Sequence, residues 1–214
     1  MGCLEFYATE LRQNPLLVLG MLMTDASLYD IGTYVCDLFA ANNRPFLLYH
    51  NAAHTTDVVL HAIEIGAFYK LSDTDNFMLL AAAWFHDTGH LFADLATHEQ
   101  ESVRLMRAYF AEHPIPAANI EIIAGCIMAT KLPAEPQTLL QQIICDADTY
   151  HLGSDEFWKM DPLVKAEMEA RFGKPIEHWK EKTYAFLQSH HYFTTYAQER
   201  LAPVKQAHMR TLMP

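Results

Sequence analysis

The sequence lacks long apolar runs and closely spaced cysteines. No segment approaches about 18 uninterrupted apolar residues, the length that predicts a transmembrane helix. No basic region followed by an apolar run indicates a signal peptide at the N-terminus. The four cysteines show no CxxC spacing, so we expect neither a cysteine zinc site nor a disulfide framework. Together these absences predict a cytoplasmic protein with no membrane partner.

Basic charge is also scarce. Lys and Arg number 15 against 26 Asp and Glu, which gives a formal net charge of −11. This balance argues against binding to a nucleic-acid backbone, whose contacts depend on Lys and Arg. A small phosphate ligand stays compatible with an acidic chain, because a metal ion and a few local cations invert the field. The 12 histidines are many for 214 residues and favour metal or acid–base chemistry.

The bulk composition is that of a globular protein. Hydrophobic residues make up 51% of the chain and charged residues 19%. Apolar residues recur at helical spacings nearly throughout, with no internal repeat and no glycine-rich phosphate loop. We therefore predict an all-α fold in a single domain over residues 1–214. Its core is expected at about 25–160, with C-terminal helices at 155–210 packed on that core.

Turn signals divide the helical pattern into segments. Pro15 interrupts the first segment, and a Gly-Lys-Pro sequence at 173–175 breaks the last. The aromatic side chains of the last segment are assigned to the core, namely Trp179, Phe186, Tyr192 and Phe193. The predicted helices span 4–23, 27–41, 53–69, a helix from N-cap candidates at 72–75 to 86–87, 98–112, 117–131, a helix that contains 139–148 and ends near Gly153, and, with the break, 155–210.

A polar pair ends the most hydrophobic of these segments. The run 77–85 is apolar on almost every side and predicts a central helix. His86 and Asp87 follow it, and we expect Gly89 to take the left-handed conformation that ends many helices. A charged aspartate is rarely buried unless it is paired or bound to a metal. Taken alone, the pair is equally well explained by a hydrogen-bonded core histidine and a capping aspartate.

Further polar side chains lie at the ends of other apolar helices. His54 closes the segment at residues 49–54 (YHNAAH), and Asp146 and Asp148 end the apolar helix at 139–148. Imidazoles together with two carboxylates suit a divalent ion that keeps open positions for water and substrate. One ion would explain several buried polar groups that otherwise each need a partner.

At these positions the chain resembles the HD-domain superfamily of metal-dependent phosphohydrolases. That family has a His, then a His-Asp pair, then a distant Asp, on a helical bundle. The corresponding residues here are His54, His86, Asp87 and Asp148. The resemblance covers about residues 25–160 and implies that these four side chains bind the metal.

The last of the four ligands has two candidates. In the family the distant Asp follows an Ala and precedes a Leu by four residues, which Asp148 fits better than Asp146. We therefore predict Asp148 as the ligand and Asp146 as a supporting or helix-terminal group.

A second likeness is local. Residues 49–54, followed by Asp57 and Val58, resemble the corresponding segment of cyclic-nucleotide phosphodiesterases. The longer phosphodiesterase motif has a second His and an Asn after the His-Asp pair, and residues 88–91 (TGHL) match it only in part.

Dinuclear members of the superfamily have two further histidines. His98 fits the first of these positions, whereas the second falls near Thr130 and Lys131, where no histidine is found. We therefore expect one divalent ion, with Mn, Mg, Co, Ni, Fe and Zn as candidates. Lys131 either places a fixed positive charge where a phosphate oxygen binds or is a solvated helix end. His98 and Glu99 are otherwise explained as ordinary residues of a helix start.

The resemblance also implies a reaction, the hydrolysis of a phosphoester or phosphoanhydride. The substrate would be a nucleotide or another small phosphorylated metabolite, activated by the ion together with a water molecule. His50 is the candidate for donating a proton to the leaving group. Glu99 or Asp57 is a candidate for orienting the attacking water. The other histidines are assigned to the surroundings of the ligands or to the surface, namely His61, His90, His151, His190 and His191.

Two other functions compete with this one. An HD-type di-iron oxygenase would need two irons, and the missing histidine near Lys131 counts against it. A non-catalytic regulatory module would keep the ion for structure alone. We also expect that the apolar, aromatic-rich C-terminal third leaves room for a homodimer interface.

Overall fold

The structure is a computed structural model that describes residues 26–42 and 44–213. These residues form ten α-helices and two short 3-10 helices, and they contain no β-strand. The all-α prediction is therefore confirmed. The helix predicted at 4–23 lies outside the described residues. Among the helices that are described, none is both long and apolar enough to cross a membrane.

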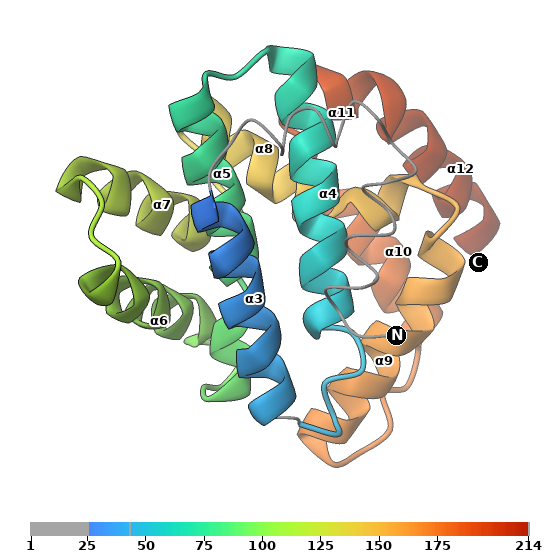
Figure 1. Ribbon diagram of the computed structural model, residues 1–214. Coiled ribbons are helices and arrows are strands. Elements are labelled where there is room, and N and C mark those ends of the chain that lie inside the picture. Colours follow the sequence, from blue (N-terminus) through green and yellow to red (C-terminus); the bar gives the residue numbers. More distant parts are fainter. Residues whose placement is uncertain (1–25, 43, 214) are drawn as a thin grey trace.

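The helices follow one another through short connections, and Figure 1 shows their arrangement. Helix α6 begins and ends at the predicted residues, whereas α7 ends two residues earlier than predicted. Helix α8 begins at the predicted residue but ends at Asp148, and a separate 3-10 helix, η2, extends to Gly153. The helices are α3 (Ala26–Ala41), α4 (Ala52–Tyr69), α5 (Asp73–Phe85), η1 (Thr88–Leu91), α6 (His98–Glu112), α7 (Ala117–Ala129), α8 (Leu139–Asp148), η2 (Tyr150–Gly153), α9 (Phe157–Phe172), α10 (Trp179–Ser189), α11 (Thr195–Arg200) and α12 (Ala202–Leu212).

Side-chain caps explain where the two central helices begin. Asn51 precedes α4, and its side-chain oxygen accepts hydrogen bonds from the backbone N–H groups of Ala53 and His54. Ser72 precedes α5 and accepts from the N–H of Asp75. Each cap satisfies backbone donors that the helix itself leaves unpaired. The Asn51 cap also fixes the first turn of α4, which carries His54.

Helix α5 is the centre of the fold. Every residue from 78 to 85 is at most 3% exposed. The helix contacts α3, α4, α7 and α8, so it is surrounded on nearly all sides. In Figure 1, α6 and α7 lie to one side of α4 and α5, and α9 to α12 lie to the other. The burial explains why this segment has no polar face, and it delivers His86 and Asp87 into the protein interior.

The C-terminal helices pack around a small second cluster of buried side chains. Leu152 of η2, Phe157 of α9, Leu187 of α10 and Leu212 of α12 form it. The predicted break at 173–175 is present, and Gly173 there has φ 64°, a left-handed conformation that favours glycine. Through η2 this cluster adjoins the end of α8, so the C-terminal helices border the site described below.

Two expectations were wrong in detail. Gly89 does not have a positive φ, because among the described glycines only Gly173 does. A glycine is needed at 89 for space, since a Cβ there would lie 1.9 Å from the carbonyl oxygen of His98. In addition, Cys36 is disulfide-bonded, whereas Cys126 and Cys145 are buried free thiols.

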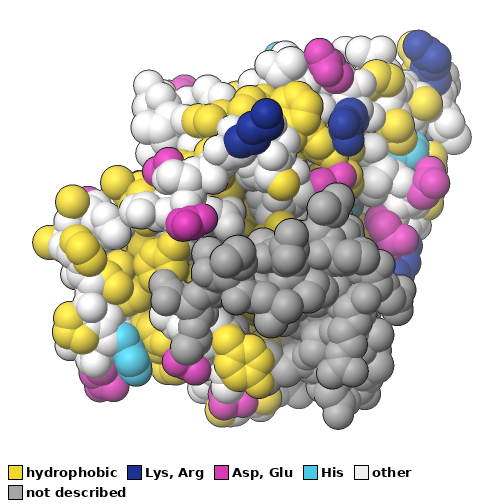
Figure 2. Space-filling model, turned by 45° about the horizontal axis from the view of Figure 1, so that its top comes forward, with side chains coloured by type: hydrophobic (Ala, Val, Ile, Leu, Met, Phe, Trp, Pro, Cys, Tyr) yellow, Lys and Arg dark blue, Asp and Glu magenta, His cyan; other side chains and the backbone are white. Residues whose placement is uncertain are grey.

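Basic residues are sparse on the surface as well as in the composition. Among the described residues on the face shown in Figure 2, Lys and Arg side chains lie apart from one another, with acidic side chains interspersed. On this face the described residues form no continuous basic surface of the kind that tracks a nucleic-acid backbone.

Candidate metal centre

Three elements bring the four predicted metal ligands together. His54 lies in the first turn of α4, His86 and Asp87 follow the last residue of α5, and Asp148 is the last residue of α8. His54 and His86 are buried, Asp87 is 4% exposed, and the Asp148 side chain is 23% exposed. The site is therefore formed where three apolar helices end or begin against one another.

The carboxylates of Asp87 and Asp148 lie between the two imidazoles. His54 Nε2 is 3.1 Å from Asp148 Oδ1 and 3.4 Å from Asp87 Oδ2. His86 Nε2 is 3.3 Å from Asp87 Oδ2 and 3.6 Å from Asp148 Oδ1. Single atoms of His54, His86 and Asp148 all lie within 4.8 Å of one another. Two nitrogens and two carboxylates thus point at one small volume.

Hydrogen bonding leaves the ligand atoms available. His86 Nδ1 is 2.8 Å from the carbonyl oxygen of Ala83, which can only accept, so Nδ1 carries the proton and Nε2 keeps its lone pair. His86 Nε2 and Asp87 Oδ2 are buried and make no hydrogen bond. Buried polar atoms without a partner are costly, and a divalent cation would satisfy both of them. The residues present therefore fit a metal ion.

The electrostatics of the cluster agree with this fit. Burial alone would lower the pKa of His54, but contacts with Asp148 and Asp87 outweigh burial and raise that pKa to about 9. Burial likewise would raise the pKa of Asp148, and contacts with His54 and His86 lower it instead. The two carboxylates thus favour the protonated, positively charged imidazoles. A metal cation that binds between these groups would displace those protons and supply the positive charge itself.

The choice between Asp146 and Asp148 follows from their partners. Asp148 faces His54 and His86, as described above. Asp146 is fully buried and accepts hydrogen bonds from the backbone N–H groups of Phe193 and Thr194, at 2.9 and 2.7 Å. Asp146 therefore ties α8 to the segment before α11, and Asp148 is the carboxylate that faces the cluster.

Substitution of these two residues is expected to separate the roles. Asp148→Asn should weaken metal binding at least about 100-fold, because even an indirect partner of a metal ligand contributes 10- to 100-fold. Asp146→Asn should instead lower the free energy of unfolding by about 2 kcal/mol, since it weakens hydrogen bonds to a buried carboxylate. Metal titration and urea denaturation of both variants measure the two effects. Equal loss of metal by both variants would contradict this assignment.

A second group of side chains surrounds the other oxygen of Asp87. Asp87 Oδ1 is 3.7 Å from His90 Nε2 and 3.9 Å from His98 Nε2, and the His90 and His98 rings stack. His50, Asp87 and His90 also have atoms close enough to hold an ion. His98, which fits the first of the two histidine positions of a second metal site, therefore lies near Asp87. The second position has no histidine, but His90 lies beside His98.

The hydrogen bonds of His90 argue against its being a ligand. Its Nδ1 lies 3.1 Å from Arg171 Nη2, and a guanidinium can only donate, so the neutral ring carries its proton on Nε2. That protonated Nε2 is the atom directed at Asp87. Burial lowers the pKa of His90 to about 2, which keeps the ring neutral. Asp87, His50 and His98 then remain of this second group.

Lys131 and Glu99 lie next to each other at the edge of the site. Lys131 Nζ donates to the carbonyl oxygen of Ala96 at 2.7 Å and is 3.5 Å from Glu99 Oε2. Glu99 is 3% exposed and lies 3.6 Å from His98 Nε2. The Lys131 side chain is 40% exposed, so its charge is directed partly at solvent and partly at this buried carboxylate. Asp57, the other residue predicted to orient water, does not line the cavity described below.

Two residues that the sequence did not indicate complete the surroundings of His50. His50 Nδ1 is 2.7 Å from Glu167 Oε1 of α9, and Glu167 Oε2 accepts from the backbone N–H groups of Tyr49 and His50. Arg171 donates to the same carboxylate from one turn further along α9. Burial alone would raise the pKa of Glu167, but the contacts with His50 and with the backbone N–H groups of Tyr49 and His50 lower it to about 2. A lone Glu in a helix without a clear apolar face gives no sequence signal for such a role.

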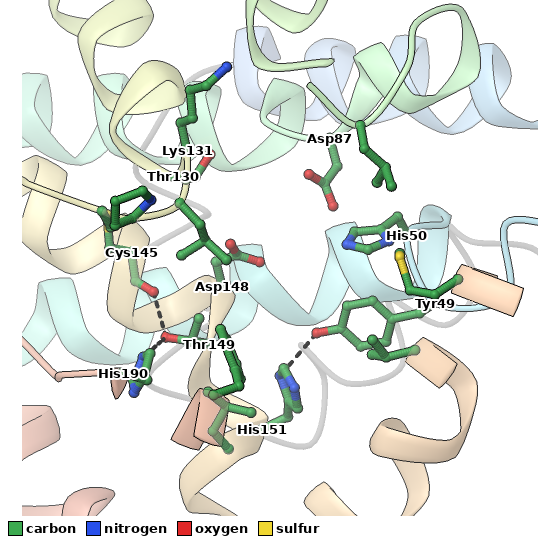
Figure 3. Close-up of a pocket in the computed structure, with 18 of the residues that line it drawn as sticks. Tyr49, His50, Asp87, Thr130, Lys131, Cys145, Asp148, Thr149, His151 and His190 are labelled. Atoms are coloured by element: carbon green, nitrogen blue, oxygen red, sulfur yellow. Dashed lines mark hydrogen bonds between the residues drawn. The ribbon is translucent and has the colours of Figure 1, made fainter. Parts of the chain in front are cut away.

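A cavity of about 1140 Å³ lies beside this cluster, and the residues that line it include His50, Asp87, Glu99, Lys131 and Asp148. Figure 3 shows Asp87, Asp148 and His50 around the same space, with Lys131 at its edge. His190 also lines this cavity, bonded to Thr149, so its assignment to the surface was wrong.

Two aromatic residues of the C-terminal segment differ from their predicted role. Tyr192 is buried in the core as predicted. Phe193 packs against the core, as predicted, and also lines the cavity. Trp179 and Phe186 line the cavity instead, and Phe186 is 37% exposed. Periodicity identifies an apolar helix face, but it does not reveal whether a cavity lies in front of that face.

Comparison with known proteins supports the resemblance seen in the sequence. A family model described as HD domain matches residues 51–153, which contain all four residues of the cluster. No curated protein and no solved structure was found to match the chain. The chain therefore carries a domain of the HD-domain superfamily over residues 51–153.

Proposed function

We propose that this protein is a metal-dependent phosphohydrolase that cleaves a phosphoester or phosphoanhydride of a small molecule. HD domains belong largely to metal-dependent hydrolases, which supports the general class. The observation that carries the proposal is the pair of buried, unpartnered atoms, His86 Nε2 and Asp87 Oδ2, inside a cluster of four ligand-type side chains.

One divalent ion fits the residues better than two. His54, His86 and Asp148 have ligand atoms within 4.8 Å of one another, and Asp87 Oδ2 lies 3.4 Å from His54 Nε2 and 3.3 Å from His86 Nε2. The second group loses a ligand because Arg171 fixes the proton of His90 on Nε2. When bound, the ion would supply Lewis-acid activation of the phosphoryl group and of water.

His50 is placed to handle the proton of the leaving group. Its Nδ1–H donates to Glu167, which leaves Nε2 as the ring nitrogen available to a ligand in the cavity. In the protonated ring, Nε2–H donates its proton to the leaving oxygen as the P–O bond breaks, while the oxygen of water forms the new P–O bond. Glu167 stabilises the positive charge of the imidazolium and fixes its orientation.

Lys131 and Glu99 complete the polar end of the cavity. The Lys131 ammonium lies where it can pair with a phosphoryl oxygen that is not part of the broken bond. Glu99, buried between His98 and Lys131, holds both side chains in place. His90 Nε2 lies 3.7 Å from Asp87 Oδ1, so the His90 ring borders this carboxylate without a hydrogen bond to it.

Metal reconstitution with a substrate panel tests the proposal. The protein is stripped with a chelator, loaded with Mn, Mg, Co or Ni, and assayed for phosphate release from nucleotides, cyclic nucleotides, phosphosugars and aryl phosphates. We expect phosphate release that depends on the metal, with one metal per chain. Turnover of none of these compounds with any metal would reject the proposal. Two irons per chain with oxygen consumption would favour the oxygenase instead.

A further inference from the structure

We propose that the substrate is a phosphomonoester with a single phosphate and a bulky apolar organic group, rather than a nucleotide or a polyphosphate. This inference rests on the proposed phosphohydrolase function and specifies its substrate. It comes from the part of the cavity that lies beyond the metal cluster.

The cavity is much larger than a phosphate needs. Its volume of about 1140 Å³ exceeds the range of roughly 300–1000 Å³ that is usual for small-molecule sites. Asp87 and Asp148 of the metal cluster, together with Lys131, form only part of its lining. The remaining space must hold the organic part of the substrate, so the residues that line it determine specificity.

Apolar side chains from η2, α9 and α10 form the wall of this remaining space. They present aliphatic and aromatic carbon to the cavity, which favours burial of an apolar group. The residues are Leu152, Phe157, Val164, Met168, Trp179 and Phe186.

The polar groups in this wall are already bonded within the protein. Asp161 accepts hydrogen bonds from Trp179 Nε1 and from Thr183 Oγ1, both at 2.9 Å. The indole N–H, the hydroxyl and the carboxylate thus satisfy one another. A nucleobase or sugar that enters here would have to break these bonds or leave its own polar atoms unpaired, which is costly.

The same is true of the wall nearest the end of α8. His190 Nε2 bonds with Thr149 Oγ1, and its Nδ1 lies 3.1 Å from the ammonium of Lys205. His151 Nδ1 bonds with the hydroxyl of Tyr49, as the dashed line in Figure 3 shows. Each of these groups already has a hydrogen-bond partner in the protein, so none of them requires a nucleobase as a partner.

Positive charge in the cavity is limited. Among the described residues that line it, Lys131 and Lys182 are the only Lys or Arg side chains. Each of them already donates to a backbone carbonyl oxygen, of Ala96 and of Glu177 respectively. A diphosphate or triphosphate would bring several negative charges into a cavity that also contains the carboxylates of Asp161, Asp87 and Asp148, which disfavours it relative to a single phosphate.

Kinetics of the metal-loaded protein with matched substrates test the inference. The substrates are 2-naphthyl phosphate, phenyl phosphate, glycerol 2-phosphate, AMP and ATP. We expect kcat/KM for 2-naphthyl phosphate to exceed that for glycerol 2-phosphate, AMP and ATP at least about tenfold, since one methylene in an apolar pocket is worth 10- to 200-fold. Equal or higher kcat/KM for AMP, ATP or glycerol 2-phosphate would overturn the inference and leave the phosphohydrolase function intact.

A pair of variants on α9 tests whether the wall is responsible. Val164→Asp places a charge in the wall, and we expect it to lower kcat/KM for 2-naphthyl phosphate about tenfold with little effect on glycerol 2-phosphate. Phe172→Asp places the same charge on the same helix at a residue that is 55% exposed and outside the cavity, and it should change neither value. If Val164→Asp fails to fold, Val164→Thr offers a milder change in the same direction. A uniform loss on all substrates would contradict the inference.

Measurements of ligand binding distinguish a wrong substrate class from a wrong phosphohydrolase function. If the protein hydrolyses none of the esters with any metal, the phosphohydrolase function is wrong. Calorimetric titration of that inactive protein with 2-naphthyl phosphate and with AMP then still decides the inference. Tighter binding of 2-naphthyl phosphate supports an apolar ligand, and equal or tighter binding of AMP overturns it.

Discussion

Replacement of Asp87 with alanine is expected to remove the bound metal and to lower phosphate release at least about 1000-fold, because metal activation contributes several kcal/mol to such reactions. Asp87 has this effect because both of its oxygens face the site. Oδ2 lies near His54 and His86, and Oδ1 lies near His90 and His98. No neighbouring side chain can replace both contacts. Metal content per chain and phosphate release of the purified variant measure the loss.

The control for this variant is Asp94→Ala. Asp94 is an exposed aspartate on the loop that follows η1, so its removal changes the net charge equally without touching the cluster. Circular dichroism of both variants should show the helicity of the wild type. Phosphate release from the Asp87→Ala protein at the wild-type rate would show that the reaction takes place elsewhere.

Glu167→Gln is expected to lower kcat about 100- to 10 000-fold, the range for loss of a proton-transfer group or of its correct tautomer. The carboxylate can only accept, so it forces the proton of His50 onto Nδ1 and stabilises the protonated ring. The amide of glutamine has nearly the same shape but no charge, so KM should change much less than kcat. Glu169→Gln, on the same helix but bonded to the N–H of Ile176, is the matched control and should leave kcat unchanged.

A leaving group that needs no proton provides a further check on this role. The defect of Glu167→Gln should be smaller with p-nitrophenyl phosphate, whose phenolate leaves without protonation, than with an alkyl phosphate. A defect of equal size on both substrates would mean that Glu167 acts on structure and not on proton transfer.

Glu167 also predicts how stability depends on pH. Its pKa is about 2 in the folded protein, below the ordinary value of 4.5. A lowered carboxyl pKa stabilises the folded state above the unfolded value, and this contribution is lost as the pH falls toward the folded value. The difference in unfolding free energy between wild type and Glu167→Gln should therefore be constant above about pH 4.5 and shrink between pH 4.5 and 2. Urea denaturation across this range measures it, and a difference independent of pH would contradict it.

Much of the fold could be predicted because helical periodicity is a local property. The apolar run before His86 has no polar face, and the structure places it at the centre of the helices. The start of α8 follows from the capping box formed by Thr138 and Gln141. The four candidate ligands were identified because a metal-type side chain at the end of an apolar helix needs an explanation of its own.

The remaining features depend on contacts between distant segments. Glu167 lies 117 residues from His50, and nothing near it in the sequence distinguishes it from an ordinary solvated glutamate. Trp179 and Phe186 have the apolar character of core residues, and only the structure shows that a cavity lies in front of them. Gly89 was correctly noticed but for the wrong reason, since the close approach of His98 to it cannot be read from the chain.

Helix α9 fixes residues 49 and 50 through Glu167, so the site includes residues beyond the matched HD domain. Glu167 holds three hydrogen-bond donors of Tyr49 and His50, yet it lies beyond residue 153, where the match to the HD domain stops. A fragment trimmed to the family boundaries would keep all four candidate ligands and lose the carboxylate that orients His50, the proposed proton donor. We expect such a fragment to bind metal but to turn over slowly, and we expect full activity only from fragments that extend through α9.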